Sequence, residues 1–297
     1  MRVIFKFTLV VLFFVYFYGC PMIYGRDIFV NSSLGDDKNS GLSEQSSGAQ
    51  DGPVQTIKQG LKLVRRGDRL VLDPTKPYKE SITLSGKNVS GQSSDLSFII
   101  EGRGAVLDGM ESLPIDVWEF YKDEIFRFRL TLPNVDVTYF HILQGGKPLK
   151  RIKVAAGAVK LPRLEASSWC IFRGYVYFRA ETGRSPMIVG DYDLSYSERR
   201  SGISVIQATN IKIHDLTIQG YQIDGISAVN GATNIVLDNV TCSMNGRSGL
   251  AIGGASFVAA GYCKFEDNLS TQILLLNYAR YILHQCNLPK NGITKSK

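Results

Sequence analysis

The sequence predicts an all-β protein: a right-handed parallel β-helix (solenoid) with an N-terminal helical cap and an inserted antiparallel β subdomain. Three observations predict it. A short, regular repeat runs through residues 201–292, its apolar positions are mostly two apart, and residues 111–200 break the pattern. Repeats of this kind are typical of solenoids, in which each unit buries its apolar face against its neighbours. A spacing of two is the period of a β-strand.

Four copies of the repeat align, and the copies open at Ala208, Ala232, Ala255 and Ala279. Each copy contains short apolar segments separated by Gly, Asn and Asp, as expected for one turn of a β-helix. Stacking the turns places residues one period apart side by side. One expected core column consists of Ile211, Ile235, Val258 and Ile282.

An asparagine recurs at one turn position, at Asn245, Asn268 and Asn291. Two interpretations stay open. Stacked Asn side chains can hydrogen-bond from coil to coil, as in other stacked parallel structures. Asn also tolerates left-handed turn geometry. Both interpretations assign these residues a structural role.

Residues 1–25 have the pattern of a secretory signal peptide. Arg2 and Lys6 precede an apolar run over residues 7–18, which is too short to span a bilayer. A lipid anchor at Cys20 is the alternative, because residues 17–20 resemble a bacterial lipobox. We therefore expect a secreted or periplasmic protein, or one anchored at Cys20, with no transmembrane span.

The chain is modestly basic, with 34 Lys and Arg against 27 Asp and Glu. Loss of residues 1–25 removes two basic residues and leaves 32 against 27, a net charge of +5. Such an excess suits an acidic polysaccharide or a membrane surface as a partner. The sequence contains no pattern of a nucleic-acid-binding module.

Four cysteines follow the expected signal peptide, at positions 170, 242, 263 and 286. An even count in an exported protein is compatible with disulfides, and Cys263 and Cys286 would share a column if the last copy is one position shorter. Small apolar columns suit buried thiols equally well. The sequence favours core thiols.

Residues 26–110 are expected to form the cap and the first coils. Residues 27–30 have the pattern of a strand, and the apolar spacing over residues 54–65 predicts a short amphipathic helix that stops before Gly67. A helix across the open end of a solenoid would cover its exposed strand edges. Further strands are expected at residues 70–72, 82–84, 98–100 and 105–107.

Residues 111–200 alternate as strands with one exposed face. The segments are residues 118–120, 125–128, 139–143 and 175–179, and Gly145-Gly146 and Arg173-Gly174 are turn signals. These features predict the antiparallel subdomain between coils.

Several motifs resemble the pectate-lyase-like superfamily of exported β-helix proteins. They are Gly35-Asp36-Asp37, Arg66-Gly67-Asp68, Pro77-Tyr78-Lys79-Glu80, Val106-Leu107-Asp108-Gly109 and Met244-Asn245-Gly246. The resemblance covers roughly residues 27–110 and 200–292. Segments 146–151 and 174–179 are similar to insertions in β-helix glycoside hydrolases. The resemblance implies the fold and chemistry on sugars, without naming one activity.

Glycoside hydrolysis uses two carboxylates that flank the scissile bond, whereas β-helix lyases use a Lys or Arg base. Stacking is expected to place Asp224 over Ser248 and Thr271, which leaves one carboxylate without a carboxylate partner, or makes it part of an Asp-Gly turn. It is also expected to place His214 beside Asp238, as an active pair or as a solvated polar column.

The remaining candidates lie in the third coil. Lys264 is a candidate base next to Glu266 and Asp267, and Arg247 a candidate partner for a sugar carboxylate. Each has a structural alternative, since exposed charges solvate a surface and an Arg stem covers apolar area. The hypothesis therefore assigns Asp224, Lys264, His214 and Asp238 to catalysis, and Arg247, Glu266 and Asp267 to substrate binding.

Two further features bear on ligands and partners. Asp36 and Asp37 could hold Ca²⁺ with their oxygens, or serve only the loop that contains them. The fourth copy ends at Gly292 before a basic tail, residues 293–297, and no C-terminal cap is recognisable. We expect a partner or missing coils to cover that end.

The sequence thus predicts an exported β-helix protein that acts on polysaccharide as a lyase or glycoside hydrolase, truncated if the missing coils were lost. The alternative is a non-catalytic carbohydrate-binding or surface β-helix protein. The substrate, its linkage and the reaction type stay open.

Overall fold

The computed structural model describes residues 25–48, 50–131, 135–181, 186–289 and 292–296. The expected signal peptide, the lipid-anchor position Cys20 and Asn291 lie outside these residues. No helix in the described ranges is long and apolar enough to cross a membrane.

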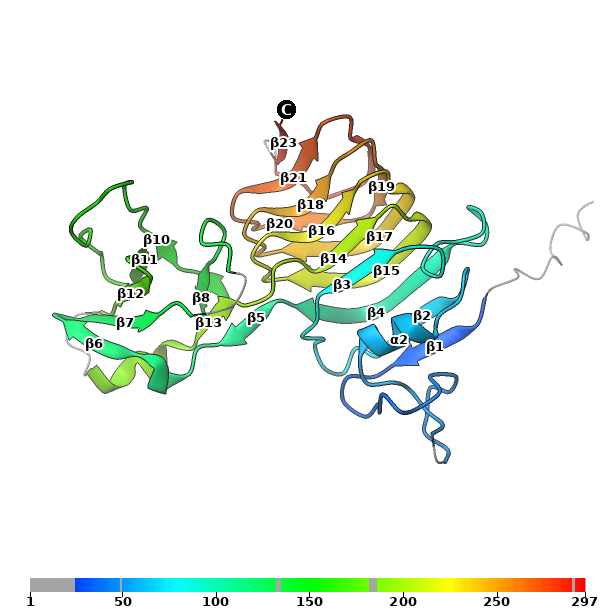
Figure 1. Ribbon diagram of the computed structural model, residues 1–297, viewed down its shortest axis with the longest axis horizontal. Coiled ribbons are helices and arrows are strands. Elements are labelled where there is room, and N and C mark those ends of the chain that lie inside the picture. Colours follow the sequence, from blue (N-terminus) through cyan, green and yellow to red (C-terminus); the bar gives the residue numbers. More distant parts are fainter. Residues whose placement is uncertain (1–24, 49, 132–134, 182–185, 290–291, 297) are drawn as a thin grey trace, which may run out of the picture.

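Two parallel sheets form the solenoid (Figure 1). The first has eight strands in the spatial order β1-β2-β4-β15-β17-β19-β22, with β20 beside β17. Its strands are β1 (Asp27–Val30), β2 (Arg69–Leu72), β4 (Phe98–Asp108), β15 (Thr209–Gln219), β17 (Thr233–Ser243), β19 (Phe257–Gly261), β20 (Lys264–Glu266) and β22 (Arg280–His284). The second has six, namely β3 (Ile82–Ser85), β14 (Ile203–Ile206), β16 (Asp224–Val229), β18 (Ser248–Ile252), β21 (Thr271–Leu276) and β23 (Ile293–Ser296).

The repeat sets the register of the coils. Ile211 pairs with Ile235, and Ile235 with Val258, and all three are buried in one continuous core. The expected fourth member is wrong, because Val258 pairs with Tyr281 rather than Ile282. The last copy is one position shorter between these strands, which turns Ile282 to the outside, where it is 57% exposed.

Single residues in the left-handed region bend the long strands. Arg103, Asp215 and Asn239 divide β4, β15 and β17 with φ of 52°, 50° and 52°. Asn and Asp occupy this conformation at low cost. The two segments of each long strand therefore meet at a bend, and the apolar side chains of both face the same core.

Asn245 and Asn268 form a buried ladder between coils. The Asn245 Nδ2 donates to Asn268 Oδ1 at 2.9 Å, and Asn245 Oδ1 accepts from the Tyr221 N–H at 3.0 Å. The residues with positive φ are those just before them, Met244 and Asp267. Coil-to-coil hydrogen bonding is therefore confirmed for this pair, and the left-handed interpretation is wrong for it.

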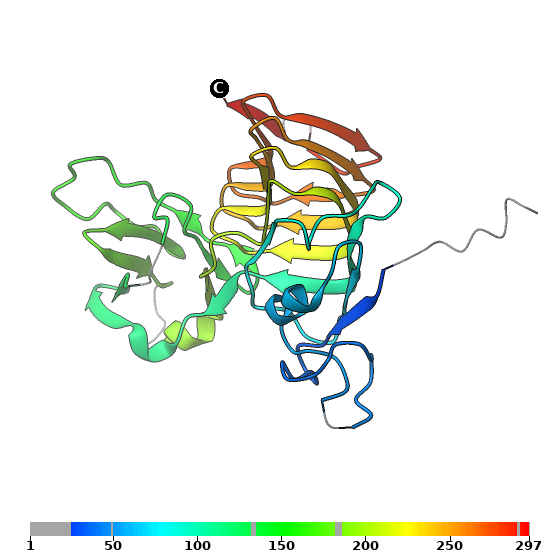
Figure 2. The same cartoon turned by 45° about the vertical axis from the view of Figure 1, so that its right-hand side comes forward.

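Helix α2 (Ile57–Leu63) occupies the centre of the expected helical segment. The Thr56 hydroxyl accepts from the Gln59 N–H, and Glu80 accepts from the first two helical N–H groups. Gly60 lets the helix approach Leu70 and Val30. The helix lies against β1 and β2 (Figure 2), and its role as a cap on the solenoid stays a prediction.

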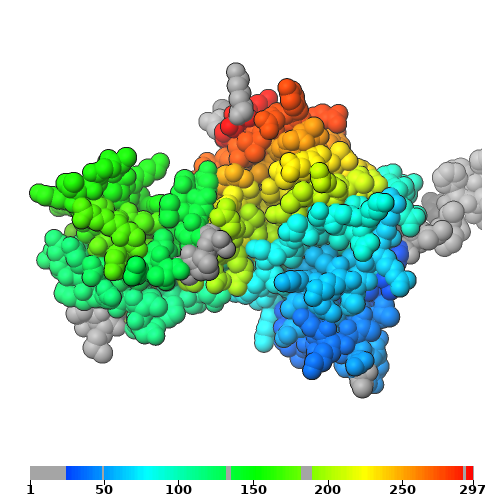
Figure 3. Space-filling model, viewed as in Figure 1, coloured from blue at the N-terminus to red at the C-terminus, as the bar shows by residue number. Residues whose placement is uncertain are grey.

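The insertion contains two small sheets and stands as a lobe beside the solenoid (Figure 3). One is β10-β11-β12-β7-β6, antiparallel except between β10 and β11; the other is β5-β13-β8-β9. Their strands are β5 (Met110–Ser112), β6 (Glu119–Lys122), β7 (Ile125–Arg129), β8 (Ile142–Gln144), β9 (Lys147–Pro148), β10 (Lys150–Arg151), β11 (Ser168–Phe172), β12 (Tyr175–Arg179) and β13 (Leu194–Ser197).

The segment expected as a basic tail is partly a strand. Ile293–Ser296 form β23, which pairs with β21 in parallel. The tail interpretation is therefore wrong for these residues, because their backbone continues the second sheet. β22 and β23 are the last strands of their sheets.

All four described cysteines are free thiols. Cys170, Cys242 and Cys263 are buried, and burial raises the pKa of the Cys242 thiol well above its usual range. The structure agrees with the thiol interpretation.

Candidate functional site

A groove of about 480 Å³ runs across the outer face of the first sheet. Side chains alternate along each strand, so the neighbours of the core residues Ile213 and Leu237 face outward here. The groove volume lies within the range of about 300–1,000 Å³ typical of small-ligand sites. The charged and imidazole side chains that line it are Arg69, Glu101, Lys212, His214, Asp238 and His284.

One row of these residues crosses the groove from strand to strand. His214 on β15 pairs with Glu101 on β4 and with Asp238 on β17. The row continues through Gly261 to His284. Neighbouring strands lie about 4.8 Å apart, so His214 stands between two carboxylates. The structure thus places His214 beside Asp238, as the repeat predicted.

The groove is lined on β19 by the small outward residues Ala259 and Gly261. A Cβ added at Gly261 would lie 3.8 Å from the Asp238 Oδ1 atom. A larger residue at this position would therefore fill the space beside that carboxylate. Because Val236 and Ile282 line the same groove, it has apolar walls as well as charged ones.

Most of the charged side chains in the groove form no contact that stabilises the fold. In the part of the chain that the structure describes, the side chains of Glu101, Lys212 and Asp238 make no hydrogen bond or ion pair. The His214 Nδ1 atom is buried and has no hydrogen-bond partner among the same residues. Arg69 differs, because it forms an ion pair with Asp27. Unpaired polar groups of this kind call for water or a ligand.

Asp224 occupies a different environment. It is 1% exposed and stacks with Ser248, which in turn stacks with Thr271, as expected. Arg247 nevertheless holds it in a two-pronged ion pair, with Nε–Oδ1 and Nη2–Oδ2 distances of 3.0 and 2.6 Å. The Ser248 hydroxyl donates to Oδ1 at 2.6 Å. Both carboxylate oxygens are therefore occupied, and the hydrogen bond to Asp224 raises the pKa of Arg247.

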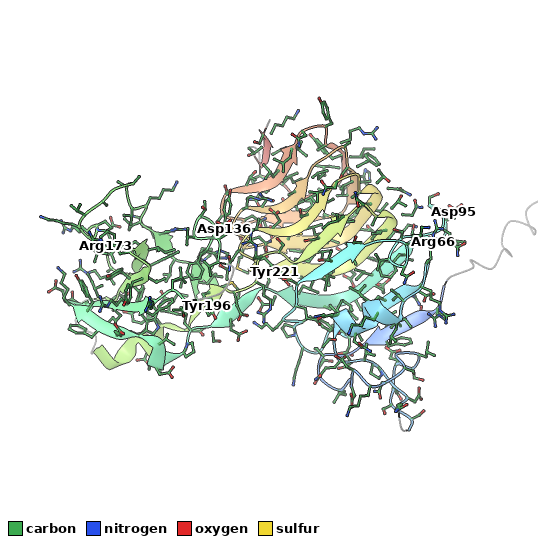
Figure 4. All side chains as sticks on the ribbon, viewed as in Figure 1. Arg66, Asp95, Asp136, Arg173, Tyr196 and Tyr221 are labelled. Carbon is green, nitrogen blue, oxygen red and sulfur yellow. The ribbon has the colours of Figure 1, made fainter. Side chains whose placement is uncertain are left out.

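These contacts favour the structural interpretation of Asp224 and Arg247, and a role of either residue in catalysis or substrate binding stays a prediction. A buried carboxylate whose two oxygens are held by a guanidinium and a hydroxyl has no oxygen left to offer to a substrate. Arg247 also lies 6.0 Å from the ring centre of Tyr139, a residue of the insertion. The pair thus stands where the insertion meets the coils, close to Asp136, which Figure 4 labels at that junction.

Lys264, Glu266 and Asp267 do not form a cluster. Lys264 and Asp267 are exposed, and Asp267 is a turn residue with φ of 55°. The Glu266 carboxylate accepts a long 3.4 Å hydrogen bond from Asn287. No ion pair joins these three among the described residues, and none of them lines the groove. They match the solvated-surface alternative.

The loop aspartates have local partners. Asp37 accepts hydrogen bonds from the Gln55 and Thr56 N–H groups and from the Thr56 hydroxyl, and Asp36 accepts from the Lys38 N–H. Within the described ranges there is no group of three or more His, Cys, Asp or Glu side chains suited to a metal. Calcium binding stays a prediction.

Sequence reasoning missed Glu101, Lys212 and His284. Glu101 precedes the insertion, so the repeat count that aligned the later coils did not reach it. His284 was hidden by the shortening of the last copy by one position. Counting outward positions backwards from His214 to the Phe98–Asp108 segment could have found Glu101.

Comparison with known proteins finds solved structures with a similar fold. No protein-family model and no curated protein matches the chain. A complex of XylC with xylose matches with a TM-score of 0.57 and 12% identity, over 91% of this chain and 60% of that one. A glycoside hydrolase matches with a TM-score of 0.61 and 11% identity, over 86% and 68%. The pectate lyase Pel9A gives a TM-score of 0.42 at 11% identity, over 90% and 56%.

At these identities the likeness concerns the fold. The chain spans 60% of the length of the XylC chain that it matches. With the two parallel sheets in register, the matches show that this protein has the parallel β-helix fold, with an antiparallel β subdomain inserted between coils.

Proposed function

We propose that this chain is an exported β-helix protein that hydrolyses a glycan in the groove, with Glu101 and Asp238 as its two acting carboxylates. The observation that carries the proposal is their position: they face outward on either side of His214 and make no ion pair within the described residues. The relatives in fold, a xylose complex of XylC and a glycoside hydrolase, support chemistry on sugars.

The spacing of the carboxylates favours inversion. Glu101 and Asp238 are two strands apart, which is about 9.6 Å between backbones. Inverting glycosidases hold their carboxyl groups roughly 6.5–9.5 Å apart to leave room for a water, whereas retaining enzymes hold them at about 5–5.5 Å. A sugar bridging the two would lie over His214, on the strand between them. One carboxyl group would then protonate the leaving oxygen while the other activates water.

Lys212 and His214 complete the site. The Lys212 ammonium has no ion-pair partner among the described residues, so it is free to hold hydroxyl or carboxylate oxygens of the sugar. His214 lies between the two carboxylates, and its buried Nδ1 atom has no hydrogen-bond partner among the described residues. These two groups would also serve an elimination reaction, so the assay must detect both products.

The test uses residues 26–297 with a panel of neutral and acidic polysaccharides. Reducing ends report hydrolysis, and the ultraviolet absorbance of unsaturated uronates reports elimination. We expect reducing ends without absorbance, and an inverted anomer in the first product by NMR. Asp238→Asn and Glu101→Gln should each lower turnover by about 100-fold or more. Glu266→Gln is the matched control and should keep full activity.

Other outcomes would redirect the assignment. If the product absorbs in the ultraviolet and Asp238→Asn is as active as the unchanged chain, the protein would be a lyase that uses Lys212. Binding of a glycan without turnover would make the groove a recognition site, which is the non-catalytic alternative. Full hydrolytic activity of both carboxylate variants, seen as reducing ends without absorbance, would remove the groove from consideration.

A further inference from the structure

The insertion carries a second polar surface that the proposed hydrolysis does not use. On the outer face of the β6-β7-β12-β11 sheet, aromatic rings alternate with cations. We call this surface the arginine–tyrosine patch, and it consists of Tyr121, Lys122, Arg127, Phe172, Arg173 and Tyr175. Figure 4 labels Arg173 on the side of the insertion away from the solenoid.

Arg127 is the centre of the patch. Its guanidinium carbon lies 5.2 Å from the ring centre of Tyr121 and 4.7 Å from that of Tyr175. Hydrogen bonds to Tyr177 and Glu119 raise the pKa of Arg127. Cation–π contact with two rings holds the guanidinium in place before a ligand arrives. The Arg127 side chain is 30% exposed and Tyr121 is 39% exposed, so the patch is open to solvent.

A strongly basic segment borders the patch. Residues 147–173 contain seven Lys and Arg and one acidic residue, Glu165. The loop within this segment packs Val154 and Leu161 against the same apolar cluster as Phe172 and Tyr175. Arg173 donates to the Val159 carbonyl at 3.2 Å, which ties the patch to the loop. The exposed cations of the loop are Lys153, Lys160 and Arg163.

These groups select for an anion of particular chemistry. Arginine forks bind carboxylate and sulfate groups with two parallel hydrogen bonds. Single-stranded nucleic acids instead need open aromatic faces on which bases stack. Arg127 covers the rings of Tyr121 and Tyr175 and forms an ion pair with Glu119. The cations that the patch offers to a ligand are therefore Lys122 and Arg173, which form no ion pair among the described residues. We propose that the arginine–tyrosine patch and its basic loop bind an anionic polysaccharide, one that carries carboxylate or sulfate groups, independently of the groove.

The test measures binding of the chain to four probes by calorimetry or affinity electrophoresis. The probes are polygalacturonate, dextran sulfate, neutral dextran and a single-stranded oligothymidylate. We expect binding to polygalacturonate or dextran sulfate that weakens with salt, and none to neutral dextran. Preferred binding of the oligothymidylate, or no binding to either anionic glycan, would overturn the proposal.

Charge-reversal variants locate the surface. Lys153→Glu combined with Lys160→Glu changes two exposed loop residues and should weaken binding at least tenfold. Lys38→Glu combined with Lys58→Glu makes the same change in net charge elsewhere and should leave binding intact. An equal loss in both would show that net charge alone acts, which contradicts a site. Asp238→Asn should bind the anionic glycan as the unchanged chain does. The proposal for the groove and the proposal for the patch can therefore fail independently of each other.

Discussion

The pairs His214–Asp238 and Asp224–Arg247 are both formed by the stacking of coils, but they differ in burial and in ion pairing. Members of each pair lie one repeat apart in the sequence and therefore on successive coils. His214 and Asp238 face outward into a groove, with no ion pair in the described part of the chain. Asp224 is buried and clamped by Arg247 and Ser248.

This difference shows how a solenoid separates the charged residues that stabilise the fold from those that can act on a ligand. A charge that faces the core must be paired, since an isolated buried ion is very costly. A charge that faces outward stays hydrated and can remain unpaired until a ligand arrives. Whether a side chain faces the core or the solvent, more than its residue type, therefore decides which pair is available for catalysis.

The largest expected effect on stability concerns Arg247. Arg247→Ala leaves the Asp224 carboxylate buried without its cation, which should lower the free energy of unfolding by about 3–5 kcal/mol. Urea denaturation measures it. Asp224→Ala should cost less, because Arg247, whose side chain is 29% exposed, can turn towards water. A loss below about 1 kcal/mol for Arg247→Ala, the size expected of an exposed ion pair, would contradict the structural role assigned to the pair.

A second comparison sets the buried Asn ladder against a more exposed one. Asn245→Ala leaves the Tyr221 N–H without its acceptor and should cost about 2–3 kcal/mol. Asn234 donates to Asn210 at 2.6 Å but is only half-buried and has φ of 53°. Asn234→Gly suits that conformation and should cost about 1 kcal/mol or less. Equal losses in thermal or urea unfolding would show that burial does not distinguish the ladders.

The buried His141, a residue of the insertion, should make the free energy of unfolding depend on pH. It is buried, and burial lowers the pKa of its imidazole to about 4. The unfolded chain takes up the proton near pH 6.5, so stability is complete above that value and falls as the pH decreases towards 4. Between pH 7 and pH 5 the loss should be roughly 2 kcal/mol. His141→Gln should flatten this part of the urea-denaturation profile, whereas His284→Gln, at an exposed site, should retain the slope.

The smallest effect is expected in the groove. Asp238→Asn removes a charge that makes no ion pair among the described residues, so the free energy of unfolding should change by no more than about 0.5 kcal/mol. The same variant should lose turnover. A stability loss as large as that expected for Arg247→Ala would mean that Asp238 serves the fold as Asp224 does.

Several parts of the fold follow from local patterns. The spacing of Ile211, Ile235 and Val258 predicted their register, because a period of two selects the inward residues and the repeat length aligns successive coils. The same count predicted His214 beside Asp238. It failed at Ile282, since a shortening by one position moves a side chain to the opposite face of the sheet.

By itself, the sequence determined the coils, their columns and the interruption between them, because apolar periodicity and turn residues act over short distances along the chain. The strand pattern could indicate that Glu101 faces outward, but the tertiary structure decided that it lies beside His214 across the insertion. It also decided that Arg247 neutralises Asp224. These contacts depend on where side chains point after the coils stack. Electrostatic pairing follows distance and burial in space, which the order of residues does not reveal.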